Sequence, residues 1–237
     1  MSKMIGLARP LRISWLNKTV DLILEGNPVE SIKEELNQYL SFEIGSPTSL
    51  RKTRESLINV WTAPSEGSSD VRTLALSLYP TRISDNLPLH WCMLAVIYPI
   101  FADICSLIGK VTAIEESFTT AWIREKLYES WGERSTLEVP VKNILRSLLD
   151  FGALEKVKTG VYKAVVRPVT DEKTICLLVL TILSLGKKAY YEIPELTRVP
   201  LFFPFEYSVT HEMLHNTANI SLSNFGGKTV VTSNARS

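Results

Sequence analysis

The sequence predicts a mainly α-helical protein, with an N-terminal helical bundle followed by winged helix-turn-helix-like modules that carry short β-hairpins. Three observations support this fold class. Apolar residues recur at helical spacing through the first half of the 237-residue chain. Two stretches have the pattern of a β-hairpin, and each follows the end of a helix and has glycine at its turn. The first half contains no glycine-rich phosphate loop and no run of alternating strands, which disfavours an α/β fold.

Three amphipathic helices are predicted first, over residues 12–26, 28–44 and 46–61. Each has apolar residues three or four positions apart, as Leu16 and Val20 are in the first helix. Asn27 is expected to cap the second helix, with Pro28 at its first helical position. The polar stretch APSEGSSD, residues 63–70, is typical of a flexible linker.

A short helix over 71–79 and a long apolar helix that begins near Pro88 come next. Residues 91–109 are long enough to cross a membrane, but Pro99 and Asp103 lie in their interior. A charge at the bilayer centre costs roughly 2.5–3.5 kcal/mol on insertion scales. The later apolar run, 175–186, is shorter than the roughly 20 residues that a span needs. We therefore expect two buried helices and no membrane partner.

The middle of the chain has the element order of a winged helix-turn-helix. A helix over 114–131 is followed by a candidate recognition helix over 139–151, and 153–167 form a hairpin that turns at Thr159-Gly160. The C-terminal region repeats this layout of helix end, small residues, strand, glycine turn and strand, with Gly226-Gly227 at its turn. The predicted domains are an N-terminal helical domain, a winged-helix-like domain and a second such module with a hairpin, over residues 1–110, 111–168 and 169–237.

Positive charge gathers in the middle module, although the whole chain carries a net charge of only +1. Residues 140–167 hold six cations and two anions. In a winged helix the recognition helix enters the major groove and the hairpin contacts phosphate or the minor groove, and neutralised phosphates give an affinity that falls with salt. The predicted groove-facing residues are Lys142 and Arg146, and the predicted phosphate contacts are Lys156, Lys158, Lys163 and Arg167. Candidates for extending this patch are Lys187, Lys188, Arg198 and Lys228.

One string has the pattern of a catalytic motif. His211-Glu212-Met213-Leu214-His215 has the H-E-x-x-H spacing that lets two imidazoles on one helix face bind zinc. A zinc peptidase also needs a third protein ligand, and no His, Asp, Glu or Cys follows His215. Because no other catalytic constellation stands out, we expect a chance match and a non-enzymatic protein without metal or cofactor.

The features of residues 12–160 resemble the BrxA-like family of bacteriophage-exclusion (BREX) defence systems. The resemblance rests on the helix that ends LILEG and on the stretches TSLRKTRESLINVW, LHWCMLAVIYPIFADICSLI and VPVKNILRSLLDFGALE. It implies a small helical domain joined to a winged helix, and binding of double-stranded DNA within a multi-protein defence system. The linker at 63–70 and the module beyond residue 168 depart from a compact member of that family.

The function expected from these features is binding of double-stranded DNA, together with other defence-system proteins, in phage defence or its regulation. A cytoplasmic location is expected because Arg9, Pro10 and Arg12 interrupt any N-terminal signal peptide. Three scattered cysteines in apolar runs also suit a reducing compartment. The alternative is an adaptor that binds other proteins through its bundle and hairpins and never contacts DNA.

Overall fold

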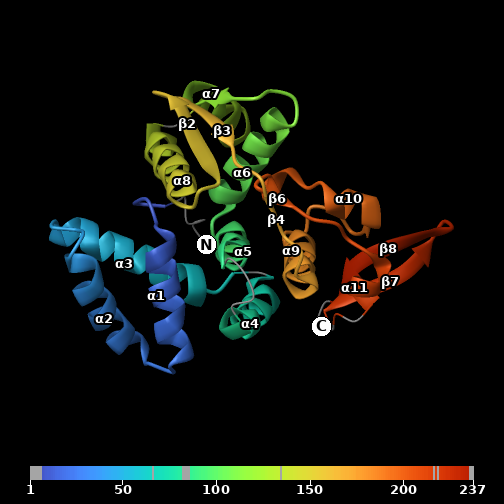
Figure 1. Cartoon of the computed structure of the whole chain (residues 1–237), viewed down its shortest axis with the longest axis horizontal. Coiled ribbons are helices and arrows are strands. Elements are labelled where there is room, and N and C mark those ends of the chain that lie inside the picture. The colour runs from blue at the N-terminus through green and yellow to red at the C-terminus, as the bar shows by residue number, and fades with distance from the viewer. Residues whose placement is uncertain are drawn as a thin grey trace.

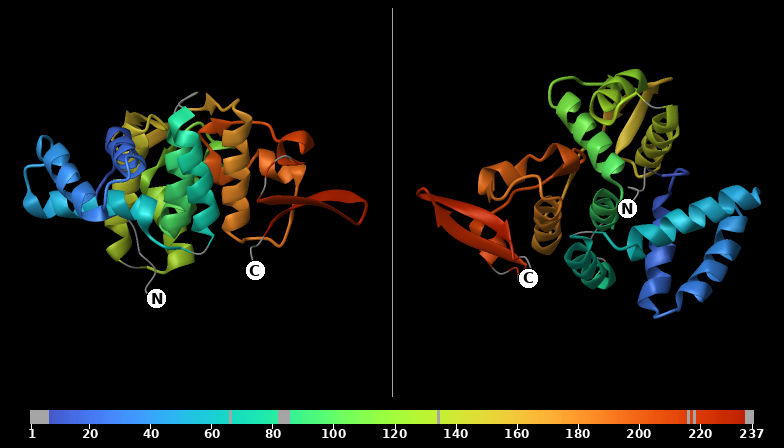
Figure 2. Two further views of the ribbon diagram at one scale, coloured as in Figure 1. Left: turned by 90° about the horizontal axis from the view of Figure 1, so that it is seen from below. Right: turned by 180° about the vertical axis from the view of Figure 1, so that it is seen from behind.

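The chain folds into three groups of elements around a shared apolar core in the computed structural model (Figure 1). The structure describes residues 7–65, 67–81, 86–133, 135–215, 217 and 219–234. Helices dominate, and the strands form three small sheets, which confirms the mainly α fold class. The long axis of the molecule runs from α2 (Val29–Ser41) to the hairpin of β7 (Ile220–Phe225) and β8 (Lys228–Ser233) (Figure 2).

The N-terminal group consists of three helices, as the apolar periodicity predicts. They are α1 (Ile13–Leu24), α2 and α3 (Pro47–Thr62), and each buries one face. Ser46 caps α3 by accepting a hydrogen bond from the Ser49 amide, and Pro47 occupies the first turn. The start of α2 lies one residue later than expected because Pro28, with extended backbone, is its N-cap. The side chain of Asn27 donates instead to the Leu22 carbonyl.

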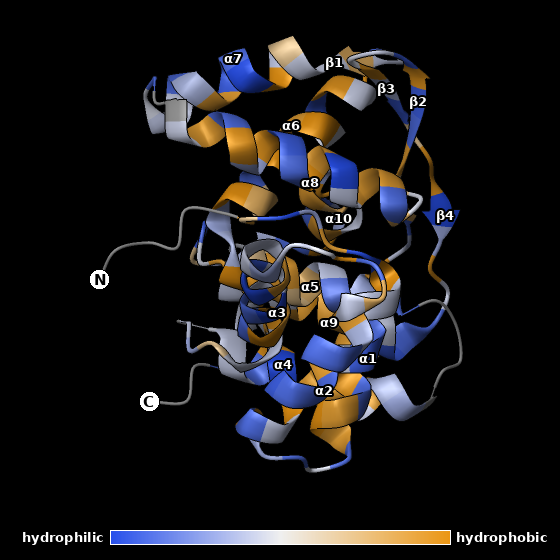
Figure 3. Cartoon of the chain, turned by 90° about the vertical axis from the view of Figure 1, so that its left-hand side faces the viewer, coloured by the Kyte–Doolittle hydropathy of each residue, from blue (hydrophilic) through white to orange (hydrophobic). Residues whose placement is uncertain are grey.

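The long apolar segment forms two helices where the sequence predicts one. These are α5 (Leu87–Ile97) and α6 (Pro99–Thr112), and they are bent by 118°. Proline cannot donate a helical hydrogen bond and disfavours a helical residue before it, so Tyr98 takes an extended conformation. Every residue of α5 is buried, and Figure 3 shows its hydrophobic colouring inside the molecule. Among the described residues no single helix is long and apolar enough to cross a membrane, although α5 and α6 meet that test as a bent pair by length and composition.

The predicted linker is partly helical. In the stretch 63–70, α4 (Ser68–Leu78) begins at Ser68, whose hydroxyl donates to the Ser65 carbonyl at 2.7 Å. Gly67 has φ +72°, and a Cβ there would lie 2.8 Å from the Ser184 carbonyl oxygen. A glycine is therefore required where this turn meets the end of α9 (Glu172–Ser184).

The first module is the series of elements that begins with α6 and ends with β3. Its order is helix, strand, two helices and a hairpin, and its antiparallel sheet has the order β1-β3-β2. Thr119 caps the second helix of the module, α7. This helix begins at Thr120, whereas the sequence predicts a helix from residue 114. The remaining bounds are β1 (Phe118–Thr119), α7 (Thr120–Trp131), α8 (Glu138–Asp150), β2 (Leu154–Lys158) and β3 (Val161–Ala164), with the short helix η2 (Ser135–Leu137) before α8.

The second module begins with α9 and repeats this order. Its antiparallel sheet has the order β5-β8-β7, in which each strand has the place of its counterpart in the first module. The series continues with β5 (Tyr191–Glu192), α10 (Ile193–Thr197), α11 (His211–His215), β7 and β8. Between α10 and α11 lie the short helix η3 (Pro200–Phe202) and β6 (Phe205–Glu206). The layout that the two glycine turns predict is therefore present in both halves.

The two modules are joined by backbone as well as by side chains. The strand β4 (Arg167–Pro168) pairs in parallel with β6 of the second module. Gly109 of α6 packs against Pro200, where an added Cβ would lie 2.1 Å from the carbonyl oxygen. Trp91 of α5 makes edge contacts with aromatic rings of α6 and of the η3–β6 segment, and its indole donates to the Leu201 carbonyl at 3.0 Å. One continuous core therefore spans the N-terminal helices and both modules.

Candidate nucleic-acid interface

Two of the predicted site residues, Lys142 and Arg146, lie one turn apart on the outer face of α8. Both side chains are exposed, and neither has an ion-pair or hydrogen-bond partner among the described residues. Glu138 and Asp150 lie one turn before and one turn after them along the same stripe of the helix. These carboxylates contact other elements, because Glu138 pairs with Arg124 at 3.5 Å and Asp150 with Arg12 at 3.8 Å. The central cations are therefore available to an external anion.

The N-terminal segment covers one flank of α8. The Leu11 amide donates to the Ser147 hydroxyl at 2.7 Å, and the Asn143 side chain donates to the Leu7 carbonyl at 2.9 Å. Farther along, the Ile13 amide donates to the Asp150 carboxylate at 3.2 Å. These contacts are not among the predicted ones, although Asn143 and Ser147 are two small polar residues one turn apart on an otherwise apolar helix face.

Lys156 and Lys158 lie on opposite faces of the hairpin, although residues two positions apart in a regular strand share a face. Lys156 pairs with Tyr162 and Lys158 with Val161, so a β-bulge lies between them. Directly paired residues project to the same side of a sheet, whereas consecutive residues project to opposite sides. Because Tyr162 and Val161 are consecutive, Lys156 and Lys158 lie on opposite faces of the hairpin. The bulge adds the residue that alternation cannot anticipate. Both lysines are exposed.

The last two predicted DNA contacts, Lys163 and Arg167, already bind other groups of the chain. Lys163 lies opposite Glu155 across the hairpin and pairs with it at 2.8 Å, and the hydrogen bond that Lys163 donates to the Glu155 carboxylate raises the pKa of Lys163. Arg167 is half-buried, and its guanidinium donates to the carbonyls of Phe151 and Gly152 at 3.4 and 3.0 Å. Those carbonyls follow the last turn of α8, where a cation is favoured. Arg167 therefore secures the helix end on which the candidate interface depends.

The zinc-peptidase string forms the short helix α11. The rings of His211 and His215 have centroids 6.3 Å apart, and both side chains are exposed. Within the described ranges no group of three or more His, Cys, Asp and Glu side chains could hold a metal ion. The free cysteines Cys92, Cys105 and Cys176 are all buried, and burial raises the pKa of each thiol, that of Cys92 to about 12. Deprotonation to the reactive thiolate is therefore disfavoured.

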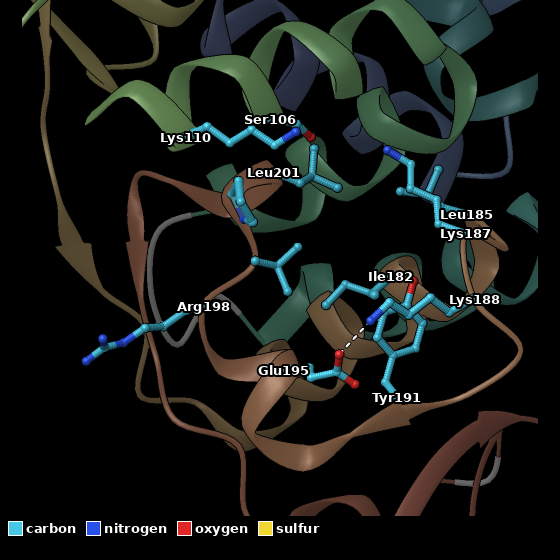
Figure 4. Close-up of a pocket in the computed structure, with 12 residues that line it drawn as sticks. Ser106, Lys110, Ile182, Leu185, Lys187, Lys188, Tyr191, Glu195, Arg198 and Leu201 are labelled. Carbon is cyan, nitrogen blue, oxygen red and sulfur yellow. Dashed lines mark hydrogen bonds and ion pairs between the residues drawn. The ribbon is translucent and has the colours of Figure 1, made fainter. Parts of the chain in front are cut away.

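Two hollows lie between the modules, beside rather than on the face of α8. One is a cleft of about 340 Å³ between α6, the end of α9 and the segment from β5 to η3 (Figure 4). The other is a groove of about 850 Å³ that is lined by the end of α6, by Ala164 and Val166, and by the segment from the end of α10 to Ser208. Lys110 and Arg198 line both hollows.

Comparisons of the chain with protein-family models, with curated proteins and with solved structures find no match.

Proposed function

We propose that the first module is a winged helix-turn-helix and that the protein binds double-stranded DNA through it. The order α6–β1–α7–α8–β2–β3, with its β1-β3-β2 sheet, supports this proposal. In that arrangement α8 is the recognition helix, and its exposed side chains enter the major groove. The repeated order in α9–β8 makes the protein a tandem of two such modules.

The observation that carries the proposal is the unpaired stripe of Lys142 and Arg146 on α8. Lys163 is paired with Glu155 across the hairpin and Arg167 donates to two carbonyls at the end of α8, whereas neither cation of the stripe has a partner among the described residues. Lys163 and Arg167 are therefore assigned to holding the module together, and the two unpaired cations to contacting DNA. Arginine at this position can also pair with guanine through two hydrogen bonds.

The hairpin contributes less to DNA binding than it would if Lys156 and Lys158 shared a face. Because Lys156 and Lys158 lie on opposite faces, one of them faces the duplex when the other faces solvent. With a net charge of +1, the molecule as a whole has little long-range attraction for DNA. We therefore propose a modest affinity that partner proteins supplement. A role in cytoplasmic phage defence rests on the resemblance of residues 12–160 alone.

The test is the affinity for a short random-sequence duplex, measured by fluorescence anisotropy at low and at moderate salt. The double variant Lys142→Glu/Arg146→Glu is expected to bind at least about tenfold more weakly than the unaltered protein. The matched control is Arg51→Glu/Lys52→Glu, which makes the same change in charge at two exposed residues of α3. Equal losses in the two variants, or no binding by the unaltered protein at low salt, would contradict the proposal.

The second candidate function is that of an adaptor for other proteins, and the groove beside the α6–η3 contact favours it. Its rim carries Ile114 and Val166, which are 85% and 58% exposed. Exposed apolar side chains beside a groove are typical of protein-binding surfaces. Pull-down with the products of neighbouring genes tests this function. A complex that survives Lys142→Glu/Arg146→Glu but not Ile114→Glu/Val166→Glu would support the adaptor.

A further inference from the structure

The cleft between the two modules combines an apolar floor with a cationic rim. Ile182 from α9, Tyr191 from β5 and Leu201 from η3 contribute buried apolar surface. Four cationic side chains and one carboxylate stand among the described residues that line it: Lys110, Lys187, Lys188, Arg198 and Glu195. Because the chain as a whole carries a net charge of only +1, this is a strong local excess.

Some of these cations already have an acidic partner. Lys188 pairs with Glu195 at 2.5 Å and lies 5.5 Å from the ring centre of Tyr191, and Lys187 lies 3.8 Å from Asp103. Lys110 has no ion-pair partner in the part of the chain that the structure describes. In Figure 4 Lys110 extends from α6 beside Ser106, on the side of the cleft opposite Lys188, whereas Arg198 extends away. An anion in the cleft therefore meets Lys110 on one side and Lys188 on the other.

We propose that this cleft binds a small organic anion that has a flat apolar body. A volume of about 340 Å³ lies at the lower end of the range of small-molecule sites. The apolar floor excludes a bare inorganic ion as the preferred ligand, since such an ion gains nothing from apolar contact. A DNA duplex is far too wide to enter a cavity of this size. The class that satisfies both floor and rim is an aromatic ring bearing a sulfonate, carboxylate or phosphate.

The ligand bridges the two modules, because Lys110 belongs to α6 and the floor belongs to α9, β5 and η3. This site does not depend on DNA binding by α8. The cleft and the α8 stripe share no residue, so each can fail without the other.

The experiment uses anilinonaphthalenesulfonate, a fluorescent aromatic anion, titrated into the folded 237-residue chain. Saturable binding at one site is expected, and Lys110→Gln/Lys188→Gln is expected to weaken it about tenfold. The uncharged analogue phenylnaphthylamine is expected to bind more weakly than the sulfonate. Thermal unfolding of each variant verifies that both exposed substitutions leave the fold intact.

Two control variants distinguish the cleft from other surfaces. Lys142→Gln/Arg146→Gln removes the same charge from α8, and Phe225→Ser removes an exposed ring of the second hairpin. Both are expected to bind the probe as the unaltered protein does. The proposal is overturned if the probe does not saturate, if the Lys110/Lys188 variant binds it equally well, or if either control loses it. Displacement of the probe by duplex DNA would also overturn it, because the cleft would then be part of the DNA path.

Discussion

The two modules share one topology but differ in their third helix. In the first module α8 has 13 residues and carries Lys142 and Arg146 on its exposed stripe. In the second module α11 has five residues, and its exposed side chains include His211 and His215. Five residues form little more than one turn, too few to lie along a groove. A repeated topology therefore does not imply a repeated function, because the side chains on the third helix decide what each module can bind.

The first helix of the second module lies deep in the core. In α9 every residue from Thr174 to Leu183 is buried, because this helix packs against α4, α5, α11 and β8. The insertion between α10 and α11 adds a further contact, since η3 packs against α6. The second module is therefore built into the core, whereas the first exposes a helix face. We infer that the second module has mainly a structural role and that the first one binds DNA.

The largest expected effect comes from the core that joins the modules. Trp91 is fully buried against Phe101, Phe203 and Phe205, and Trp91→Ala is expected to lower the free energy of unfolding by about 3–5 kcal/mol. The matched substitution Phe225→Ala removes a ring that is 64% exposed and is expected to change stability by less than about 0.5 kcal/mol. Urea unfolding of both variants measures the difference. Similar values for the two would mean that the modules are not held by this core.

A smaller effect is expected where α6 meets η3. Alanine is a better helix former than glycine by about 1 kcal/mol, but a Cβ at Gly109 would lie 2.1 Å from the Pro200 carbonyl oxygen. Because backbone cannot rotate away as a side chain can, the overpacking cost of about 1–3 kcal/mol outweighs the gain. Gly109→Ala should therefore lower the melting temperature. Gly45→Ala, where the added Cβ meets nothing within 4 Å, is the control and should leave it unchanged.

The buried His90 makes the N-terminal core sensitive to acid. Its Nε2 lies 2.9 Å from the Asn17 side-chain oxygen, its Nδ1 is buried with no hydrogen-bond partner among the described residues, and burial lowers its pKa to about 3. The unfolded chain, with a histidine pKa near 6.5, therefore takes up the proton first as the pH falls. This contribution to stability is complete above about pH 6.5 and is lost at up to about 1.4 kcal/mol for each pH unit below it.

The measurement is the free energy of unfolding between pH 7.5 and 5, a range chosen to lie around the histidine pKa of about 6.5. His90→Phe is expected to be less stable at neutral pH and to lose most of the slope. His211→Gln/His215→Gln alters two exposed rings and should retain it. The prediction would be contradicted if His90→Phe kept the pH dependence of the unfolding free energy and His211→Gln/His215→Gln lost it. The acid sensitivity would then come from the second module and not from the N-terminal core.

The elements with strong local patterns could be predicted from the sequence. The amphipathic helices α1 to α3 and both hairpins follow from apolar spacing and from glycines at the turns, and the structure contains them all. The break at Tyr98 was within reach, because Pro99 was visible in the apolar run. The two-residue strands β1 and β5 were not, because two residues have no periodicity and only their partners define them as strands.

The candidate site was predictable only in part. Lys142 and Arg146 follow from helical spacing, because that spacing also places them on an exposed stripe. The positions of Lys156 and Lys158 depend on a bulge, and the contact of Arg167 depends on the end of α8, 15 residues away in the chain. The N-terminal segment on α8 is more distant still, since Leu11 and Ser147 are 136 residues apart. Contacts of this kind depend on tertiary structure, which local sequence does not encode.

We propose that the third helix of the first module, and not that of the second, contacts DNA. The most direct test is the salt dependence of duplex affinity, plotted as log Kd against log salt concentration. Each phosphate that a cation neutralises contributes about 0.9 to the slope, so removing both groove-facing cations in Lys142→Gln/Arg146→Gln should lower the slope by up to about 1.8, while His211→Gln/His215→Gln leaves it unchanged. An unchanged slope in the first variant, or an equal decrease in the second, would contradict the claim.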